Sequence, residues 1–283
     1  VLVFGAGKAV FAEDEAFAFA IPSNTKGVKF ICRDTFVGGD SPFNHPLSSR
    51  FEEIDSIVVF DNVLVPWERV FFYNNFEIAG KFLMESSFHH FAKYQVLIRQ
   101  IVKSEFILGI AEILIDTIKV REYQHIHEKL SEIIIGLETM KALLEKAENH
   151  AILDEWGYLR PAIFPLKVAG NIFSKLYPRY IEIIQLIGAS GMITLPTKKA
   201  FHSDIRADLD QYLQGATKTA EDRVKIFRLA WDLTMSSFGT RQMQYERFFF
   251  GDSIRAASEL YFTYPKKEYV EVVIDFLKQK ENL

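Results

Sequence analysis

Two glycine-containing segments in the second half of the chain have residue types suited to holding a cofactor. The first is Gln185-Leu-Ile-Gly188-Ala-Ser-Gly191, where two glycines three positions apart end an apolar helical pattern. Glycine has no side chain, so its backbone can approach another backbone or a ligand closely. A helix C-cap followed by a tight turn explains the pattern equally well. The residues alone leave both interpretations open.

The second segment is Phe238-Gly239-Thr240-Arg241-Gln242, which follows a helix predicted to end near Phe238. Gly239 is the expected C′ residue of that helix. Free backbone N–H groups, the Thr240 hydroxyl and the Arg241 guanidinium could bind a pyrophosphate or the edge of a flavin. The alternative is a glycine-terminated helix followed by a solvated arginine.

The histidines and the single cysteine do not form a metal-binding pattern. His89 and His90 are adjacent, so on a helix they diverge by about 100°. His125 and His127 are two positions apart and also point to different sides. Cys32 alone can form neither an internal disulfide framework nor a thiolate metal cage. We therefore predict no metal site.

The composition predicts a globular protein in the cytoplasm. Of the 283 residues, 49% are hydrophobic, and the net charge of -4 offers no electrostatic basis for binding nucleic acid. A membrane span needs a run of about eighteen uncharged apolar residues, and the sequence contains no such run. The N-terminus lacks the pattern of a signal peptide.

The first part of the chain has the pattern of strands, and the rest has the pattern of helices. We predict an antiparallel β unit over residues 1–78, part of a barrel that lacks its first strands, because the chain opens inside a strand. An all-helical bundle is predicted over residues 79–283. The fold class is thus mixed β followed by all-α. The predicted strands are Ala16–Ile21, Val28–Arg33, Ile57–Phe60 and Val63–Val65.

The helical part has apolar residues spaced three and four apart. Pro178 is expected to kink the third helix or to begin its second half. Thr219 and Asp222 form a capping-box pattern at the start of another helix. Glu246 and Arg247 are expected to pair on the surface of a packing helix over 245–250. The predicted helices are Val96–Ile118, Ile126–Ala147, Lys167–Ile187, Thr219–Phe238 and two that start at Ser253 and Lys267.

The segments Arg50–Arg69 and Phe238–Asp252 carry a family resemblance that extends over the whole chain. They resemble the large, oxygenase component of 4-hydroxyphenylacetate 3-hydroxylase. Further landmarks are Phe17–Pro22, Lys29–Arg33, Tyr177–Arg179, Tyr212–Ala216 and Phe227–Asp232. The resemblance implies an acyl-CoA dehydrogenase-like flavoprotein fold with an N-terminal helical domain, a middle β-barrel and a C-terminal bundle that forms a tetramer. This chain is expected to be the C-terminal fragment: part of the barrel and the whole bundle.

The resemblance also implies an activity, which is ortho-hydroxylation of 4-hydroxyphenylacetate or a similar phenol. The implied cofactor is FAD in its reduced form, FADH2, and the co-substrate is O2. A separate NAD(P)H-dependent flavin reductase would supply the FADH2, and the enzyme would be a homotetramer. The expected FAD contacts are Gln185, Gly188, Gly191, Gly239, Thr240, Arg241 and Gln242.

No catalytic residue is assigned, because in the family these residues come from the part that precedes Val1. The chain alone is therefore expected to be inactive. The segment Gln185–Gly191 resembles the glutamine-and-glycine turn by which acyl-CoA dehydrogenase-type flavoproteins contact the FAD of a neighbouring subunit. Ala189 replaces that family's second turn glycine.

Two alternative functions remain. A 4-hydroxybutyryl-CoA dehydratase shares the expected fold, but its iron–sulfur cluster needs several cysteines, and none occurs after Cys32. The other alternative is a non-catalytic module that oligomerises or merely binds flavin.

Overall fold

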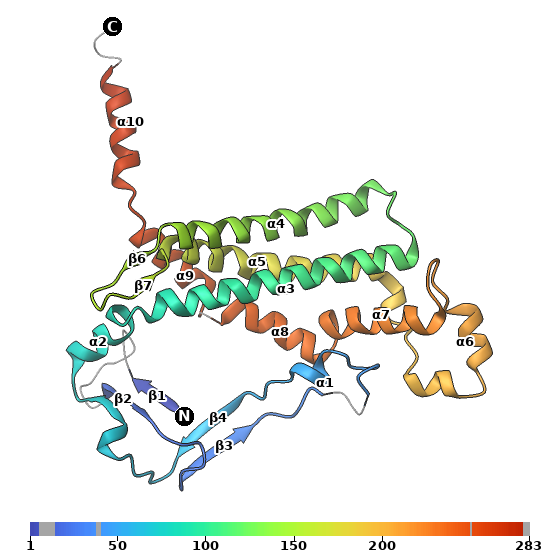
Figure 1. Ribbon diagram of the computed structural model, residues 1–283, viewed down its shortest axis with the longest axis horizontal. Coiled ribbons are helices and arrows are strands. Elements are labelled where there is room, and N and C mark those ends of the chain that lie inside the picture. Colours follow the sequence, from blue (N-terminus) through green and yellow to red (C-terminus); the bar gives the residue numbers. More distant parts are fainter. Residues whose placement is uncertain (6–14, 38–40, 250, 280–283) are drawn as a thin grey trace.

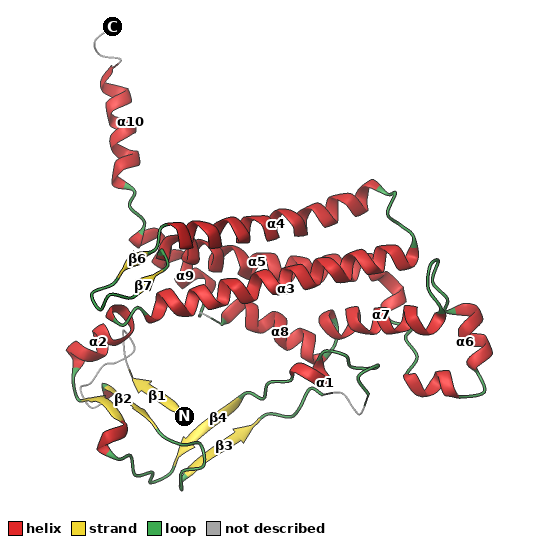
Figure 2. Ribbon diagram, viewed as in Figure 1, coloured by secondary structure: helices red, strands yellow, loops and turns green. Residues whose placement is uncertain are grey.

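The computed structural model places a small strand-rich part beneath a bundle of long helices (Figure 1). It describes residues 1–5, 15–37, 41–249 and 251–279. The three longest helices lie side by side: α3 (Phe88–Ile118), α4 (Gln124–Asn149) and α5 (Ile163–Gly188). The predicted order of a β part followed by helices is confirmed (Figure 2).

The strands form two small antiparallel sheets, and the described residues contain no closed barrel. One sheet has the order β1 (Leu2–Gly5), β2 (Phe17–Ala20) and β5 (Val70–Tyr73). The other pairs β3 (Val28–Cys32) with β4 (Ser56–Phe60), and Phe30 lies opposite Val58. A third hairpin of β6 (Ile152–Leu153) and β7 (Leu159–Arg160) joins α4 to α5.

The strand predicted over Val63–Val65 is wrong, and β5 was not predicted. Asn62 has a positive φ of 49°, and Pro66 begins a short 3₁₀ turn, so only three residues remain between two breaks. Proline also cannot donate to a strand ladder. The chain resumes an extended conformation at Val70, where it pairs with β2.

The remaining helices are shorter than α3, α4 and α5. They are α1 (Ser48–Phe51), α2 (Phe76–Glu85), α6 (Arg206–Tyr212), α7 (Ala220–Thr234), α8 (Ser237–Phe248), α9 (Ser253–Thr263) and α10 (Lys267–Gln279). Helix α5 runs through Pro178 as one element, so the proline does not end it. The predicted cap at Thr219 is confirmed, because its hydroxyl accepts the Asp222 N–H at 3.2 Å.

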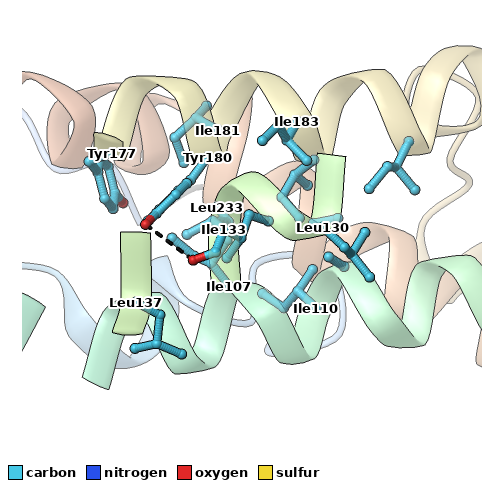
Figure 3. Close-up of a cluster of buried hydrophobic side chains, with 14 of the residues drawn as sticks. Ile107, Ile110, Leu130, Ile133, Leu137, Tyr177, Tyr180, Ile181, Ile183 and Leu233 are labelled. Carbon is cyan, nitrogen blue, oxygen red and sulfur yellow. Dashed lines mark hydrogen bonds between the residues drawn. The ribbon is translucent and has the colours of Figure 1, made fainter. Parts of the chain in front are cut away.

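The core lies where α3, α4 and α5 meet (Figure 3). Ile107 of α3, Ile133 of α4 and Tyr180 of α5 are each almost fully buried. Each such side chain stabilises the fold by about 1.5–3 kcal/mol relative to leaving it in water. Gly136 lets α5 approach α4, because a Cβ there would lie 2.0 Å from the Tyr180 hydroxyl oxygen. The closely packed bundle therefore supports the side chains on its surface.

Helix α10 projects away from the body of the molecule (Figure 1). Its apolar residues are exposed, including Val270, Val273, Ile274, Phe276 and Leu277. None of the described helices is both long and apolar enough to cross a membrane.

Candidate functional site

A cavity of about 540 Å³ lies between the bundle and the segment that leads into β4. We call residues 47–55 the strap, because this segment lines the cavity and is hydrogen-bonded to α7 at one end and to α8 at the other. Helices α3, α5, α7 and α8 form the other walls. The lining is mainly apolar and aromatic and comprises Leu47, Phe51, Glu53, Arg99, Val102, Lys103, Phe106, Ile107, Tyr177, Leu233, Phe238, Gln242 and Tyr245. Such a lining with a few polar groups is typical of a small-molecule site.

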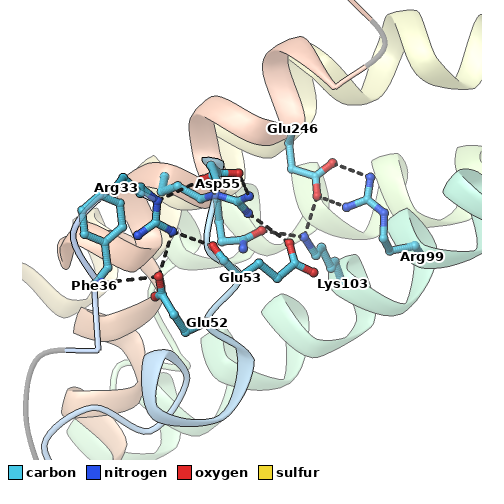
Figure 4. Close-up of polar contacts among 10 residues, drawn as sticks. Arg33, Phe36, Glu52, Glu53, Asp55, Arg99, Lys103 and Glu246 are labelled. Atoms are coloured by element: carbon cyan, nitrogen blue, oxygen red, sulfur yellow. Dashed lines mark hydrogen bonds and ion pairs between the residues drawn. The ribbon is translucent and has the colours of Figure 1, made fainter. Parts of the chain in front are cut away.

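Glu246 of α8 forms a buried ion-pair cluster with two cations of α3 beside the cavity (Figure 4). Its carboxylate accepts hydrogen bonds from Nη1 and Nη2 of Arg99 and, at 2.6 Å, from Lys103 Nζ. Lys103 also donates to Gln242 Oε1 at 3.1 Å. Burial lowers the pKa of Lys103, while Glu246 acts in the opposite direction. The predicted surface pair of Glu246 with Arg247 is wrong, because the Glu246 side chain is fully buried and faces α3.

Arg241 of α8 holds one end of the strap through Asp55. Its Nε and Nη2 donate to the two Asp55 oxygens at 3.0 and 2.5 Å, and its Nη1 donates to Glu53 at 3.2 Å. Arg33 at the end of β3 donates to the same Asp55 carboxylate at 3.0 Å. The hydrogen bonds from Arg241 and then Arg33 lower the pKa of Asp55 to about 2.

Asp232 of α7 holds the other end of the strap. Its Oδ2 accepts the backbone N–H groups of Leu47 and Ser48 at 2.7 and 2.9 Å. These N–H groups begin α1, so the carboxylate caps that short helix from another part of the chain. Asp232 is fully buried, and its Oδ1 has no partner among the described residues. The strap is therefore fastened to the bundle by one carboxylate at each end.

The glycines of the first predicted segment pack against the chain itself. Gly188 ends α5, and a Cβ there would lie 2.2 Å from the Met192 sulfur. A Cβ on Gly191 would lie 2.8 Å from the Phe227 ring. Gln185 donates to the Thr234 carbonyl at 3.2 Å, which brings it to the end of α7. None of the three lines the cavity, and their contact with FAD stays a prediction.

The second predicted segment lies beside the cavity, but its local structure differs from the prediction. Helix α7 ends at Thr234, and Gly239 is in the first turn of α8 instead of at a C′ position. The Ser236 hydroxyl accepts the Gly239 N–H at 3.0 Å. Ser236 is thus the N-cap of α8, and serine is a preferred residue at that position, so a new helix starts here. A Cβ at Gly239 would lie 2.4 Å from the Leu233 carbonyl oxygen.

The other three predicted FAD contacts in this segment have different surroundings. The Thr240 hydroxyl donates to the Ser236 carbonyl at 2.9 Å. The predicted solvated alternative for Arg241 is wrong, since its side chain is only 15% exposed and is neutralised by Asp55 and Glu53. Gln242 is the member of the predicted set that lines the cavity.

Several residues of the site were not predicted from the sequence. They are Lys103, Arg99, Tyr177, Asp55 and Asp232. A signal existed for Asp55, because the acidic run of Glu52, Glu53 and Asp55 lies in the distinctive Arg50–Arg69 segment. Among the described residues, no group of three or more His, Cys, Asp or Glu is arranged to hold a metal ion.

Comparison with known proteins identifies the family. The model of the 4-hydroxyphenylacetate 3-hydroxylase C-terminal region matches residues 79–278, and that of the N-terminal region matches residues 1–72. The chain belongs to the 4-hydroxyphenylacetate 3-hydroxylase family. A probable 4-hydroxyphenylacetate 3-monooxygenase of Bacillus subtilis (strain 168) is 67% identical over 98% of this chain. The oxygenase component from Thermus thermophilus is 47% identical over 95% of it.

Solved structures of this 4-hydroxyphenylacetate 3-hydroxylase family have the same fold. One oxygenase component, complexed with FAD and 4-hydroxyphenylacetate, is 44% identical and matches all of this chain with a TM-score of 0.95. An archaeal 4-hydroxybutyryl-CoA dehydratase matches with a TM-score of 0.83 at 19% identity, which shows a shared fold alone. The chain spans 57% of the Bacillus relative and 60% of the solved oxygenase.

Proposed function

We propose that this chain forms the bundle side of the active site in a reduced-FAD-dependent aromatic monooxygenase. The substrate would be 4-hydroxyphenylacetate or a similar phenol, hydroxylated ortho to its hydroxyl group with O2. The observation that carries the proposal is the aromatic cavity, because Phe238 and Gln242 of the family segment line it directly. The names of the Bacillus and Thermus relatives and the solved oxygenase complexed with FAD support this assignment.

The residues of the cavity fit a flat aromatic ring better than they fit a pyrophosphate. Phe51, Phe106 and Phe238 present apolar surface, and Gln242 presents an amide. Arg241 does not fit the predicted role of a free phosphate ligand, because two carboxylates already neutralise it. Gly239 offers no open cradle either, since its missing Cβ would meet the carbonyl of Leu233. We therefore propose Gln242 as the ligand-facing residue of this segment and Arg241 as part of the strap's anchor.

Bound FAD, once reduced, would supply the electrons that activate O2. The chain's own residues would orient the ring and exclude water. The apolar wall formed by Leu47, Phe106 and Ile107 excludes water from one side of the cavity. The ion pair with Glu246 holds the Lys103 ammonium in place. Because this ammonium donates to Gln242 Oε1, it fixes the orientation of the Gln242 amide.

The remaining parts of the site and the partners are also proposals. The groups that hold the phenol would come from the region that the relatives have in addition to the part matched by these 283 residues. Gln185, Gly188 and Gly191 would contact the FAD of a neighbouring copy in a homotetramer. The exposed apolar residues of α10 favour such assembly. A separate NAD(P)H-dependent flavin reductase would provide FADH2 in the cytoplasm, where the exposed free Cys32 would stay reduced.

A binding and turnover experiment tests this proposal. The purified chain is titrated with FAD and with 4-hydroxyphenylacetate, and then incubated with a flavin reductase, NADH and O2. We expect saturable binding of at least one ligand and no catechol product. The Q242A variant should bind more weakly, whereas Q244A, on the exposed face of the same helix, should bind like the wild type. Formation of catechol would refute the expected inactivity of the chain alone.

An alternative outcome would favour a different function. If the chain binds neither ligand but sedimentation shows a stable tetramer, the non-catalytic assembly module is the better description. The exposed apolar residues of α10 support this alternative. The dehydratase alternative stays disfavoured, because the chain has the single cysteine Cys32.

A further inference from the structure

Tyr177 is a buried residue in the wall of the cavity. It lies on α5 directly before Pro178, is 1% exposed and lines the cavity wall. Among the described residues, no hydrogen bond involves its hydroxyl group, and Figure 3 draws one from Tyr180 but none from Tyr177. Its ring packs against Phe173 at 5.7 Å and lies 5.8 Å from Lys103 Nζ, so the side chain has a defined position.

When a tyrosine lines a cavity and its hydroxyl has no partner among the described residues, the molecules that fill the cavity can supply that partner. Water can pair with it in the free protein, but an aromatic ligand that displaces this water has to replace the hydrogen bond. A ligand without an acceptor would leave the hydroxyl unpaired, which weakens its binding. Burial, followed by the charge of Glu246, raises the pKa of Tyr177, so the group stays a neutral donor.

We propose that Tyr177 is a specificity-determining residue whose hydroxyl donates a hydrogen bond to an acceptor atom on the edge of the bound aromatic ring. The inference rests on the proposed function and adds a residue to it. The acceptor chemistry, an oxygen or ring nitrogen on a flat aromatic system, could belong to the phenol or to the flavin. Tyr177 then selects rings that carry such an acceptor over plain hydrocarbon rings.

Tyr180 provides a matched control on the same helix. It is equally buried, but its hydroxyl donates to the Ile133 carbonyl at 3.4 Å, and it does not line the cavity. Y177F removes a hydroxyl with no partner among the described residues, so the melting temperature should stay within about 2 °C of the wild type or rise. Y180F removes a hydroxyl that has a protein partner, so the melting temperature should fall while ligand binding is unchanged.

The experiment measures the affinity of the wild type, Y177F and Y180F for FAD, 4-hydroxyphenylacetate and phenylacetate. If the hydroxyl meets the phenol, Y177F weakens 4-hydroxyphenylacetate about three- to tenfold and removes its advantage over phenylacetate. If it meets the flavin, Y177F weakens FAD by that factor and leaves the other two ligands unchanged. Wild-type affinities in Y177F for all ligands would overturn this inference alone. Absence of any binding by the wild-type chain would overturn the inference and the proposed function together.

Discussion

The ion pair between Asp55 and Arg241 gives a prediction whose magnitude follows from the structure. A fall in the Asp55 pKa from 3.8 to about 2 corresponds to roughly 2.5 kcal/mol of stabilisation. The Asp55 side chain is 55% exposed, however, so solvent screens the interaction. We therefore expect D55N to lower the free energy of unfolding by about 1 kcal/mol at pH 7 and low salt.

The effect of D55N should depend on pH in a definite direction. Because the pKa of Asp55 is lower in the folded chain, its stabilisation is complete above about pH 4. That stabilisation is lost as the pH falls from about 4 through about 2, where the carboxylate of the folded chain takes up its proton. The wild type and D55N should therefore approach equal stability toward the lower end of this range.

Urea denaturation of a double-mutant cycle is the suitable assay. D55N, R241Q and the double variant should be non-additive by about 1 kcal/mol at pH 7, because the two side chains share one interaction. D61N is the matched control, since the Lys29–Asp61 pair on the same hairpin is exposed on both sides and should contribute under about 0.5 kcal/mol. Additive effects of D55N and R241Q would refute the anchoring of the strap by this pair.

Three further perturbations test the site. E246Q leaves Arg99 and Lys103 without their buried carboxylate, so it should lower the free energy of unfolding, measured by urea denaturation, by about 3 kcal/mol. A loss below about 1 kcal/mol would contradict the burial of this ion pair. G239A forces a Cβ against the Leu233 carbonyl and should lower stability by about 1–3 kcal/mol, whereas G80A, with open space around it, should be neutral or stabilising. D232N should cost about 1–3 kcal/mol and expose the strap to limited proteolysis; an unchanged cleavage rate would show that its bonds to α1 are dispensable.

The elements that follow from local periodicity could be predicted from the sequence. The apolar spacing from Ile126 to Ala147 indicates the helix that the structure shows as α4. The Thr219 cap also follows from residues close in sequence. The end of α7 could not be predicted in the same way. Gly239 fits the pattern of a residue that ends a helix, whereas Ser236 fits the pattern of an N-cap that starts one. Local sequence patterns predict that a helix forms. They do not predict whether a glycine between two helices ends the first or lies in the first turn of the second.

The polar contacts of the site depend on distant residues and could not be predicted. Asp55 and Arg241 are 186 positions apart, and Arg99 and Glu246 are 147 apart. The sequence pattern around Glu246 indicates an amphipathic helix, but it does not show that the glutamate faces a pair of cations on α3. Burial is set by which helix packs there, so a surface pair with Arg247 was the simpler expectation.

The anchor of the strap has a consequence for the order of folding. The bond from the Leu47 N–H to Asp232 closes a loop of 185 positions, and closing so long a loop is slow compared with forming neighbouring helices. During synthesis, residues 47–55 leave the ribosome long before α7 exists. We expect the bundle to assemble first and the strap to dock onto it afterwards, so that the ligand cavity is among the last features of the molecule to take shape.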